Sequence, residues 1–202
     1  MISEKDLERF LQQNIIIDLE NGRPNDKPHT LLVVDEIKNI IENSPDLHLD
    51  RDVLIIAAYA HDWGYTGLLD PGVTIRLEHL GALKESHMAL GAEKLAGLLK
   101  DYFFDYLTQE QKDRAIHLVL VHDKLASLID PDEIVLMEAD SLAGMESDVM
   151  GVFGDTESED RYMRKSRDLR LSRFITDYSK KRFEVLFEKR KKLFEDSHLR
   201  AS

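Results

Sequence analysis

An apolar segment that ends in the adjacent residues His61 and Asp62 constrains the fold of this chain most strongly. Residues 54–62 are apolar on nearly every side, which predicts a helix buried at the centre of a helical core. Asp50 precedes the segment and is a candidate N-cap residue. The end of this helix therefore presents an imidazole and a carboxylate, two groups that bind metal ions, beside the core.

The remaining sequence also has helical periodicity, and we expect an all-α fold. Ser3 with Asp6 resembles a capping box, and Thr108 with Gln111 predicts a second helix start. Pro131 fits the first turn of a helix, where proline is favoured. The expected helices cover residues 7–19, His29 to 43, Leu54 to Asp62, Leu83 or Ser86 to Leu99, Thr108 to Lys124 or Ala126, Pro131 past Asp140, and Ser158 to Glu195, the last as one or two long helices.

Residues 63–82 predict a long loop directly after His61 and Asp62, because they contain several glycines, Pro71 and many charges. Loops of this length are uncommon unless they serve a function. We therefore interpret this one as a candidate lid or substrate-binding loop.

The length and composition predict one soluble domain whose polar site uses nitrogen and oxygen ligands. The chain has 202 residues, enough to bury a core without disulfides, and it contains no cysteine. Any metal ion is then held by His, Asp and Glu side chains, which suit iron, manganese, zinc or magnesium. The N-terminus lacks the pattern of a signal peptide, and no apolar run reaches the roughly 18 residues that span a membrane. We expect a cytoplasmic protein.

Charge is distributed unevenly along the chain, whose net charge is −12. Residues 161–202 hold 14 Lys and Arg against 6 Asp and Glu, so the preceding body is strongly acidic, which argues against nucleic-acid binding there. The basic segment can bind phosphate groups, through Arg161, Arg164 and Arg167, or pair with the acidic body or a second subunit. Its apolar residues predict core packing or a homo-oligomer interface through the C-terminal helices.

Six potential metal ligands follow one another along the predicted helices, in the order His29, His61, Asp62, His87, His122 and Asp140. The local sequences around them include His29-Thr30-Leu31-Leu32-Val33, Ala57-Ala58-Tyr59-Ala60-His61-Asp62-Trp63-Gly64, His87-Met88-Ala89-Leu90-Gly91-Ala92 and Ala139-Asp140-Ser141-Leu142. In this order they resemble the motifs of the HD-domain superfamily of metal-dependent phosphohydrolases. The resemblance covers roughly residues 25–150 of a single domain, 1–202, and leaves roughly residues 158–196 as a charged helical extension.

The resemblance implies a site for two divalent metal ions per chain. One ion would be held by His29, His61, Asp62 and Asp140, and the second by His87 and His122, with Asp62 bridging the two. Ligands from separate helices can converge on one point in a bundle core. Two ions about 3.5–4 Å apart can bind a phosphoryl oxygen and lower the pKa of a bridging water, which would attack phosphorus. The ligands do not distinguish Fe, Mn, Zn, Ni, Co and Mg.

One ligand position stays open in the sequence, because His117 and His122 lie on the same predicted helix. Five residues turn a helix by about 140° beyond a full turn, so the two imidazoles cannot easily face one metal ion. We prefer His122, which follows the aliphatic residues 118–121 and lies nearer the helix end.

The chain departs from the commonest family motif at Tyr65, where many members carry a lysine credited with contacting the phosphate. Lys124, two residues after His122, or Arg76 in the predicted loop could supply the missing cation. Tyr65 itself could instead donate a hydrogen bond to the substrate.

The resemblance implies hydrolysis of a phosphoester in a small phosphorylated metabolite, and a nucleotide is the expected substrate. The catalytic residue would be Asp62, as the ligand that both metals share. Two alternatives use the same ligand set or fold: a mixed-valent diiron oxygenase of the HD fold, and a non-catalytic regulatory HD protein that binds a nucleotide. The ligand pattern alone does not separate these functions.

Overall fold

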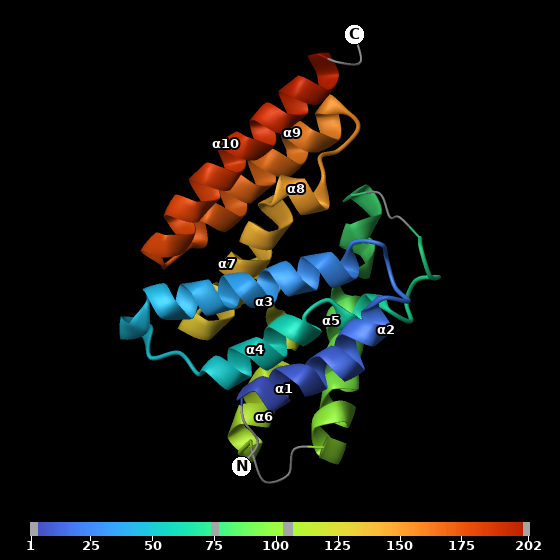
Figure 1. The fold of residues 1–202 in the computed structure, drawn as a ribbon, viewed down its shortest axis with the longest axis vertical. Helices are drawn as coiled ribbons and strands as arrows, with labels where there is room; N and C mark the ends of the chain where they lie inside the picture. The colour runs from blue at the N-terminus through green and yellow to red at the C-terminus, as the bar shows by residue number, and fades with distance from the viewer. Residues whose placement is uncertain (1–3, 74–76, 103–106, 200–202) are drawn as a thin grey trace.

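The computed structural model describes residues 4–73, 77–102 and 107–199, and it confirms the all-α fold (Figure 1). Within these ranges the only strand-like pairing is an isolated bridge between Thr66 and Leu69. No helix of the described ranges is both long and apolar enough to cross a membrane. The α-helices are α1 Glu4–Leu11, α2 Ile17–Leu19, α3 Asp26–Asn43, α4 Arg51–Ala60, α5 Leu77–Tyr102, α6 Gln109–Val121, α7 Pro131–Met145, α8 Ser147–Met150, α9 Thr156–Lys165 and α10 Asp177–Leu199.

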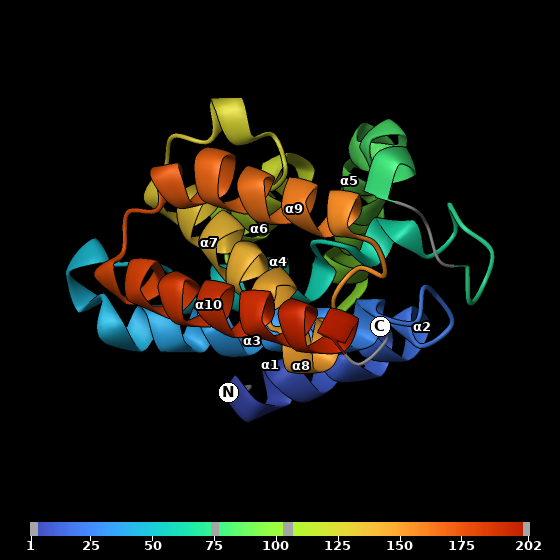
Figure 2. The same cartoon turned by 90° about the horizontal axis from the view of Figure 1, so that it is seen from above.

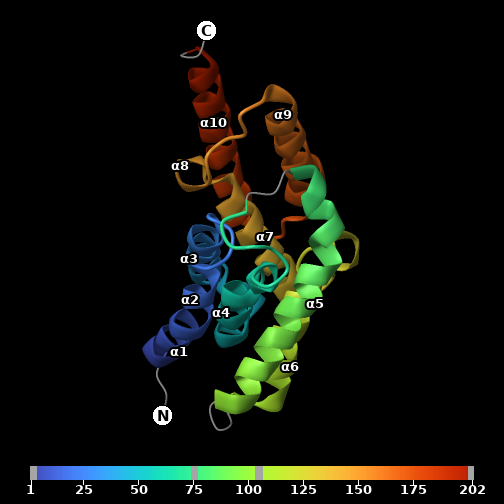
Figure 3. The ribbon, with the colours of Figure 1, turned by 90° about the vertical axis from the view of Figure 1, so that its right-hand side faces the viewer.

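Helix α4 lies at the centre of the core, as predicted (Figures 1 and 3). Every residue from Val53 to Ala60 is buried, and α4 packs against α3, α6, α7 and the N-terminal helices. Asp50 Oδ1 accepts a hydrogen bond from the Val53 amide at 3.2 Å, so the predicted N-cap is confirmed. Because α4 ends at Ala60, His61 and Asp62 lie in the turn that follows it.

The N-terminal helices form one nearly continuous stretch that covers the side of α4. A π-helical turn, Gln12–Ile16, joins α1 to α2. The predicted apolar stripe is buried, with Leu7, Leu11 and Ile15 fully covered by the core. The capping box predicted at Ser3 lies outside the described residues.

Helices α6 and α7 begin where their sequence signals predict. Thr108 and Gln111 form the reciprocal hydrogen bonds of a capping box, which confirms the start of α6. Pro131 occupies the first turn of α7, where proline is tolerated because it has no amide hydrogen to leave unpaired. Helix α6 ends at Val121, so the expected end near Lys124 or Ala126 is wrong by about a turn, and His122 stands at the helix C-cap.

The predicted loop over residues 63–82 is too long at both ends. Trp63–Tyr65 form a short 3-10 helix, and α5 already begins at Leu77 rather than near Leu83 or Ser86. Gly81 obscured this helix in the sequence, because glycine inside a helix costs about 1 kcal/mol relative to alanine. Gly81 is exposed, and no neighbouring atom lies near its Cβ position. The missing side chain therefore leaves no gap in the core.

The C-terminal segment forms a second layer at one end of the bundle (Figures 1 and 2). Helix α9 continues through a π-helical turn, Ser166–Arg170, and a 3-10 helix, Leu171–Arg173, before the chain reverses into α10. Helix α10 packs against α7, α8 and α3. Phe174, Phe183 and Phe187 of this layer are buried, and the Phe183 ring contacts the other two, so these residues form core rather than free surface.

Basic residues of the C-terminal layer pair with acidic residues of the body. Arg182 contacts Glu36 of α3, and Lys189 contacts Glu146 at the end of α7. The buried guanidinium of Arg190 instead pairs with Glu159 of α9 and donates to the Gly144 carbonyl oxygen. The predicted pairing between the basic segment and the acidic body is therefore confirmed for these residues.

Candidate metal centre

Three buried histidines turn the same ring nitrogen, Nε2, toward the Asp62 carboxylate. His61 and His122 follow the ends of α4 and α6, and their Nδ1 atoms each lie 2.8 Å from a backbone carbonyl oxygen three residues earlier. His87, inside α5, makes the same kind of contact with the Leu83 carbonyl at 3.2 Å. Because a carbonyl can only accept, Nδ1 must carry the hydrogen, and Nε2 is left as the inward-facing nitrogen. Metal-binding histidines are commonly oriented in this way.

The first candidate group consists of His29 from α3, His61 and Asp140 from α7. Their ligand atoms all lie within 4.8 Å of one another, and His29 Nε2 lies 3.0 Å from Asp140 Oδ1. His61 Nε2 is buried without a hydrogen-bond partner among the described residues. A buried polar atom without a partner is costly, so this nitrogen fits the position of a metal ligand.

The second candidate group consists of Asp62, His87 and His122. The Nε2 atoms of His87 and His122 are 3.4 Å apart, and they lie 3.6 and 3.7 Å from Asp62 Oδ1. The other carboxylate oxygen of Asp62 lies 3.7 Å from Nε2 of His61 in the first group. Asp62 therefore stands between the two groups, where a bridging ligand would stand.

The electrostatics of the two groups suit a cation with nitrogen and oxygen ligands. Burial lowers the pKa of His61 to about 4, so its imidazole is neutral near pH 7 and its Nε2 carries a lone pair. Burial alone would raise the pKa of Asp62, but His61, His122 and Arg23 together hold it well below its usual range. Asp140 likewise has a lowered pKa, since Arg170 and His29 outweigh its burial. Although burial opposes it, Asp140 raises the pKa of His29, and Asp62 raises that of His122. Divalent metals bind neutral imidazoles and ionised carboxylates, so a bound ion would displace any proton that these two histidines hold.

Close helix packing fixes His87 against the turn that carries His61 and Asp62. A Cβ atom at Gly64 would lie 1.8 Å from the backbone oxygen of His87. A Cβ atom at Gly91, one turn along α5, would lie 3.3 Å from the Gly64 nitrogen. The two glycines of the local motifs therefore allow α5 to approach the turn closely enough to bring the candidate groups together.

The structure separates the two histidines that the sequence left open. His122 joins the second group, whereas His117 Nε2 lies 2.8 Å from Glu133 Oε1 near the start of α7. The role of His122 as a ligand stays a prediction, and His117 has a hydrogen-bonding role away from the candidate ligands.

The residues predicted to contact substrate lie in different surroundings. The Tyr65 ring stacks on the His87 imidazole with centroids 4.2 Å apart, so Tyr65 borders the second group directly. Lys124 is exposed, and Arg76 lies outside the described residues. For all three, contact with the substrate stays a prediction.

Two arginines that the sequence did not single out contact the candidate ligands. Arg170, in the π-helical turn after α9, donates to Asp140 Oδ2 and to Asp123 Oδ1, both at 2.6 Å. Arg23, just before α3, lies 3.3 Å from Asp62 Oδ2, and its guanidinium carbon is 3.6 Å from the centre of the Tyr65 ring. Neither arginine belongs to a local motif; each lies among other charged residues, so only the fold reveals its contact.

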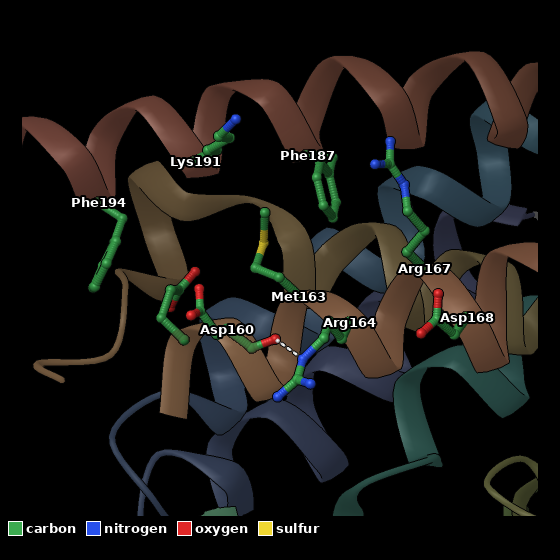
Figure 4. A pocket seen from close by; sticks show the side chains of 9 residues that line it. Asp160, Met163, Arg164, Arg167, Asp168, Phe187, Lys191 and Phe194 are labelled. Carbon is green, nitrogen blue, oxygen red and sulfur yellow. Dashed lines mark hydrogen bonds between the residues drawn. The ribbon is translucent and has the colours of Figure 1, made fainter. Parts of the chain in front are cut away.

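A groove of about 610 Å³ lies between α9 and α10, and none of the six candidate ligands lines it (Figure 4). Arg164 and Arg167, which the sequence offered as phosphate contacts, line this groove. Arg167 there pairs with Glu184 and packs over the Phe187 ring. These two arginines thus belong to the C-terminal layer, in which Arg170 contacts the candidate ligand Asp140.

Comparison with known families gives one match. The family model described as HD domain matches residues 28–145, more than half of the chain, and this range contains all six candidate ligands. No curated protein and no solved structure matched the chain. The chain belongs to the HD-domain superfamily of metal-dependent phosphohydrolases.

Proposed function

We propose that this protein is a metal-dependent phosphohydrolase that cleaves a phosphoester of a small phosphorylated metabolite, with nucleotides as the expected substrates. One observation carries the proposal: the Nε2 atoms of His61, His87 and His122 face inward around Asp62, with their Nδ1 atoms engaged by backbone carbonyls. The family supports the same reading, because HD domains are metal-dependent hydrolases.

The donor set fits two divalent ions. His29, His61 and Asp140 would hold one ion, and His87 and His122 the other, with Asp62 shared between them. Such ions, when bound, supply charge stabilisation to a phosphoryl group and lower the pKa of a water molecule. The protein contributes rigid orientation, since all six of these ligands come from packed helices or from turns that directly follow them.

Individual side chains around the site then have definable roles. Tyr65 holds the His87 imidazole by stacking against its face, so the ring cannot rotate freely. Asp18 accepts hydrogen bonds from the Trp63 indole and from Lys94, each at 2.6 Å, and this network ties the turn after Asp62 to α5. The turn that carries Asp62 is therefore fixed by contacts with α2 and α5.

The proposal is tested on the full chain, purified without chelators and loaded with manganese, iron, cobalt or nickel. Products are separated and identified by chromatography: inorganic phosphate and an alcohol from phosphomonoesters, a phosphomonoester and an alcohol from phosphodiesters, and a nucleoside or shorter nucleotide from nucleotides. We expect metal-dependent turnover of at least one nucleotide or related phosphate ester. Absence of turnover with every metal, at confirmed metal occupancy, would contradict the proposal. Substrate-dependent oxygen uptake with the signal of a coupled Fe(II)/Fe(III) pair would identify the oxygenase alternative instead.

A further inference from the structure

Three cations from separate parts of the chain surround the candidate metal centre. Arg170 comes from the turn after α9, Arg23 from the segment before α3, and Lys84 from α5. Arg170 and Arg23 are largely buried, with side chains 21% and 16% exposed, whereas Lys84 is 37% exposed and lies 3.4 Å from Asp123. The two arginines are thus built into the site.

Arg170 links Asp140 of the first candidate group to Asp123, the residue next to a ligand of the second group. One guanidinium nitrogen donates to Asp140 Oδ2 at 2.6 Å and to Ser141 Oγ at 3.0 Å. The other donates at 2.6 Å to Asp123, which directly follows the candidate ligand His122. A planar guanidinium with several fixed donors matches the geometry of a phosphoryl group as well as that of carboxylates.

Arg23 holds the equivalent place beside the shared ligand. It lies 3.3 Å from Asp62 Oδ2 and packs over Tyr65, while its Nε donates to Asp26 at 2.7 Å. The Asp26 contact anchors the side chain near the site whether or not the Asp62 contact persists.

Metal binding would change the net charge around these three cations, and with it the groups that they bind. Four carboxylates, those of Asp26, Asp62, Asp123 and Asp140, face the three cations named above. Two divalent ions would turn this small negative excess into a positive one and would compete with the arginines for Asp62 and Asp140 oxygens. Guanidinium donors freed from those oxygens would then lie beside the metals, where a phosphoryl group is held.

We propose that Arg170 and Arg23 bind the phosphoryl oxygens of the substrate, and so replace the lysine that Tyr65 displaces from the family motif. The inference rests on the proposed function and specifies its anion-binding residues. Arg170 fits this role better than Lys124, because Lys124 is exposed whereas Arg170 already contacts a candidate ligand. Both arginines act only on a metal-loaded centre, since the carboxylates occupy them otherwise.

Binding of inorganic phosphate tests the inference without requiring turnover. Calorimetric titration is done on the manganese-loaded full chain, on Arg170→Gln and Arg23→Gln, and on Arg167→Gln as a control from the same segment. Arg167 pairs with Glu184 and contacts none of the candidate ligands in the described structure. We expect each of the first two variants to bind phosphate about tenfold more weakly or worse, because each loses a charge-assisted hydrogen bond. Arg167→Gln should match the wild type.

Metal content measured on the same samples separates phosphate binding from a structural role. Arg170 competes with a metal for Asp140, so Arg170→Gln should keep its metals at unchanged or higher affinity while it loses phosphate. A variant that binds phosphate like the wild type, or a wild type that loads metal but binds no phosphate, would overturn the inference and leave metal binding intact. If Arg170→Gln does not fold, Arg23→Gln decides the result. A wild type that binds no metal would refute the proposed function itself.

Discussion

The Nε2 atoms of His87 and His122 lie 3.4 Å apart, facing each other across the second candidate group. Both rings engage a carbonyl oxygen of their own helix through Nδ1, so neither can turn its Nε2 lone pair away. Two lone pairs at this distance repel unless a proton or a cation lies between or beside them. Asp62, 3.6 to 3.7 Å from both nitrogens, adds negative charge to the same place. This geometry is the physical basis for placing a metal ion there.

Alanine substitutions of His122, which follows α6, and of His117, inside α6, should have different consequences. His122→Ala removes an inward-facing nitrogen of the second group, so we expect loss of the metal held there and of activity. His117→Ala removes only a contact with Glu133 and should keep full metal content, with a stability loss of about 1 kcal/mol. Metal analysis and thermal unfolding of both variants check this prediction. Equal metal loss in the two variants would show that the site is placed wrongly.

Asp62→Ala should abolish metal binding and activity together, because the carboxylate stands between the two groups. Removing it also leaves three buried imidazoles without the carboxylate that lies beside their Nε2 atoms. The exposed Asp160, on α9, provides a control: Asp160→Ala should retain metal and activity. Retention of full metal content and full activity by Asp62→Ala would rule out the assignment.

Sequence alone predicted the parts of this site that are local in the chain. Helix α4, its cap at Asp50 and the adjacent His61 and Asp62 follow from apolar periodicity and capping chemistry, which depend on neighbours within one turn. The resemblance to HD proteins added the order of the ligands. The start of α5 was missed, because Gly81 weakened the helical signal that the tertiary packing overrides.

Sequence patterns could not identify Arg170 and Arg23, the two arginines that contact the candidate ligands. Arg170 contacts Asp140 and Asp123, residues 30 and 47 positions away, through a π-helical turn. A contact of this range depends on how the C-terminal layer packs on α7, and no local pattern encodes it. The sequence instead offered Arg161, Arg164 and Arg167, of which Arg164 and Arg167 line the groove between α9 and α10.

Gly64 tests the close approach of α5 to the His61–Asp62 turn. Gly64→Ala would place a Cβ atom 1.8 Å from the His87 backbone oxygen, so a backbone must move and we expect a loss of about 3 kcal/mol or more with impaired metal binding. Gly97→Ala is the matched control, because that helical glycine of α5 is exposed with no atom near its Cβ position. It should stabilise the protein by about 0.4–1 kcal/mol. Chemical denaturation measures both; a harmless Gly64→Ala would refute the packing argument.

Glu133 should make the stability of the protein depend on pH in the acid range. Burial opposes its ionisation, but hydrogen bonds from the Ile129 amide, His117 and the Asp130 amide outweigh it and lower its pKa below the ordinary 4.5. A carboxyl with a lowered folded pKa stabilises the protein above pH 4.5 and loses that contribution as the pH falls below it.

Glu133→Gln should therefore lower the free energy of unfolding by about 1 kcal/mol near neutral pH, because the charged acceptor of the Ile129 and Asp130 amide hydrogen bonds is lost. The difference in the free energy of unfolding between this variant and the wild type should shrink as the pH falls below 4.5. Denaturation at a series of pH values measures it. A difference that stays constant across this range would exclude the carboxylate as its source. Arg114, which also contacts Glu133, remains charged throughout, so its own protonation state does not contribute to this pH dependence.

Metal content per chain tests the account most directly. The full chain is purified without chelators, supplied with manganese or iron, and analysed for bound metal by mass spectrometry alongside His87→Ala. We predict about two ions per wild-type chain, as in two-metal hydrolytic sites, and a loss of about one in the variant. Wild-type protein that binds no metal, or that binds the same amount as His87→Ala, would contradict the two-metal centre around Asp62.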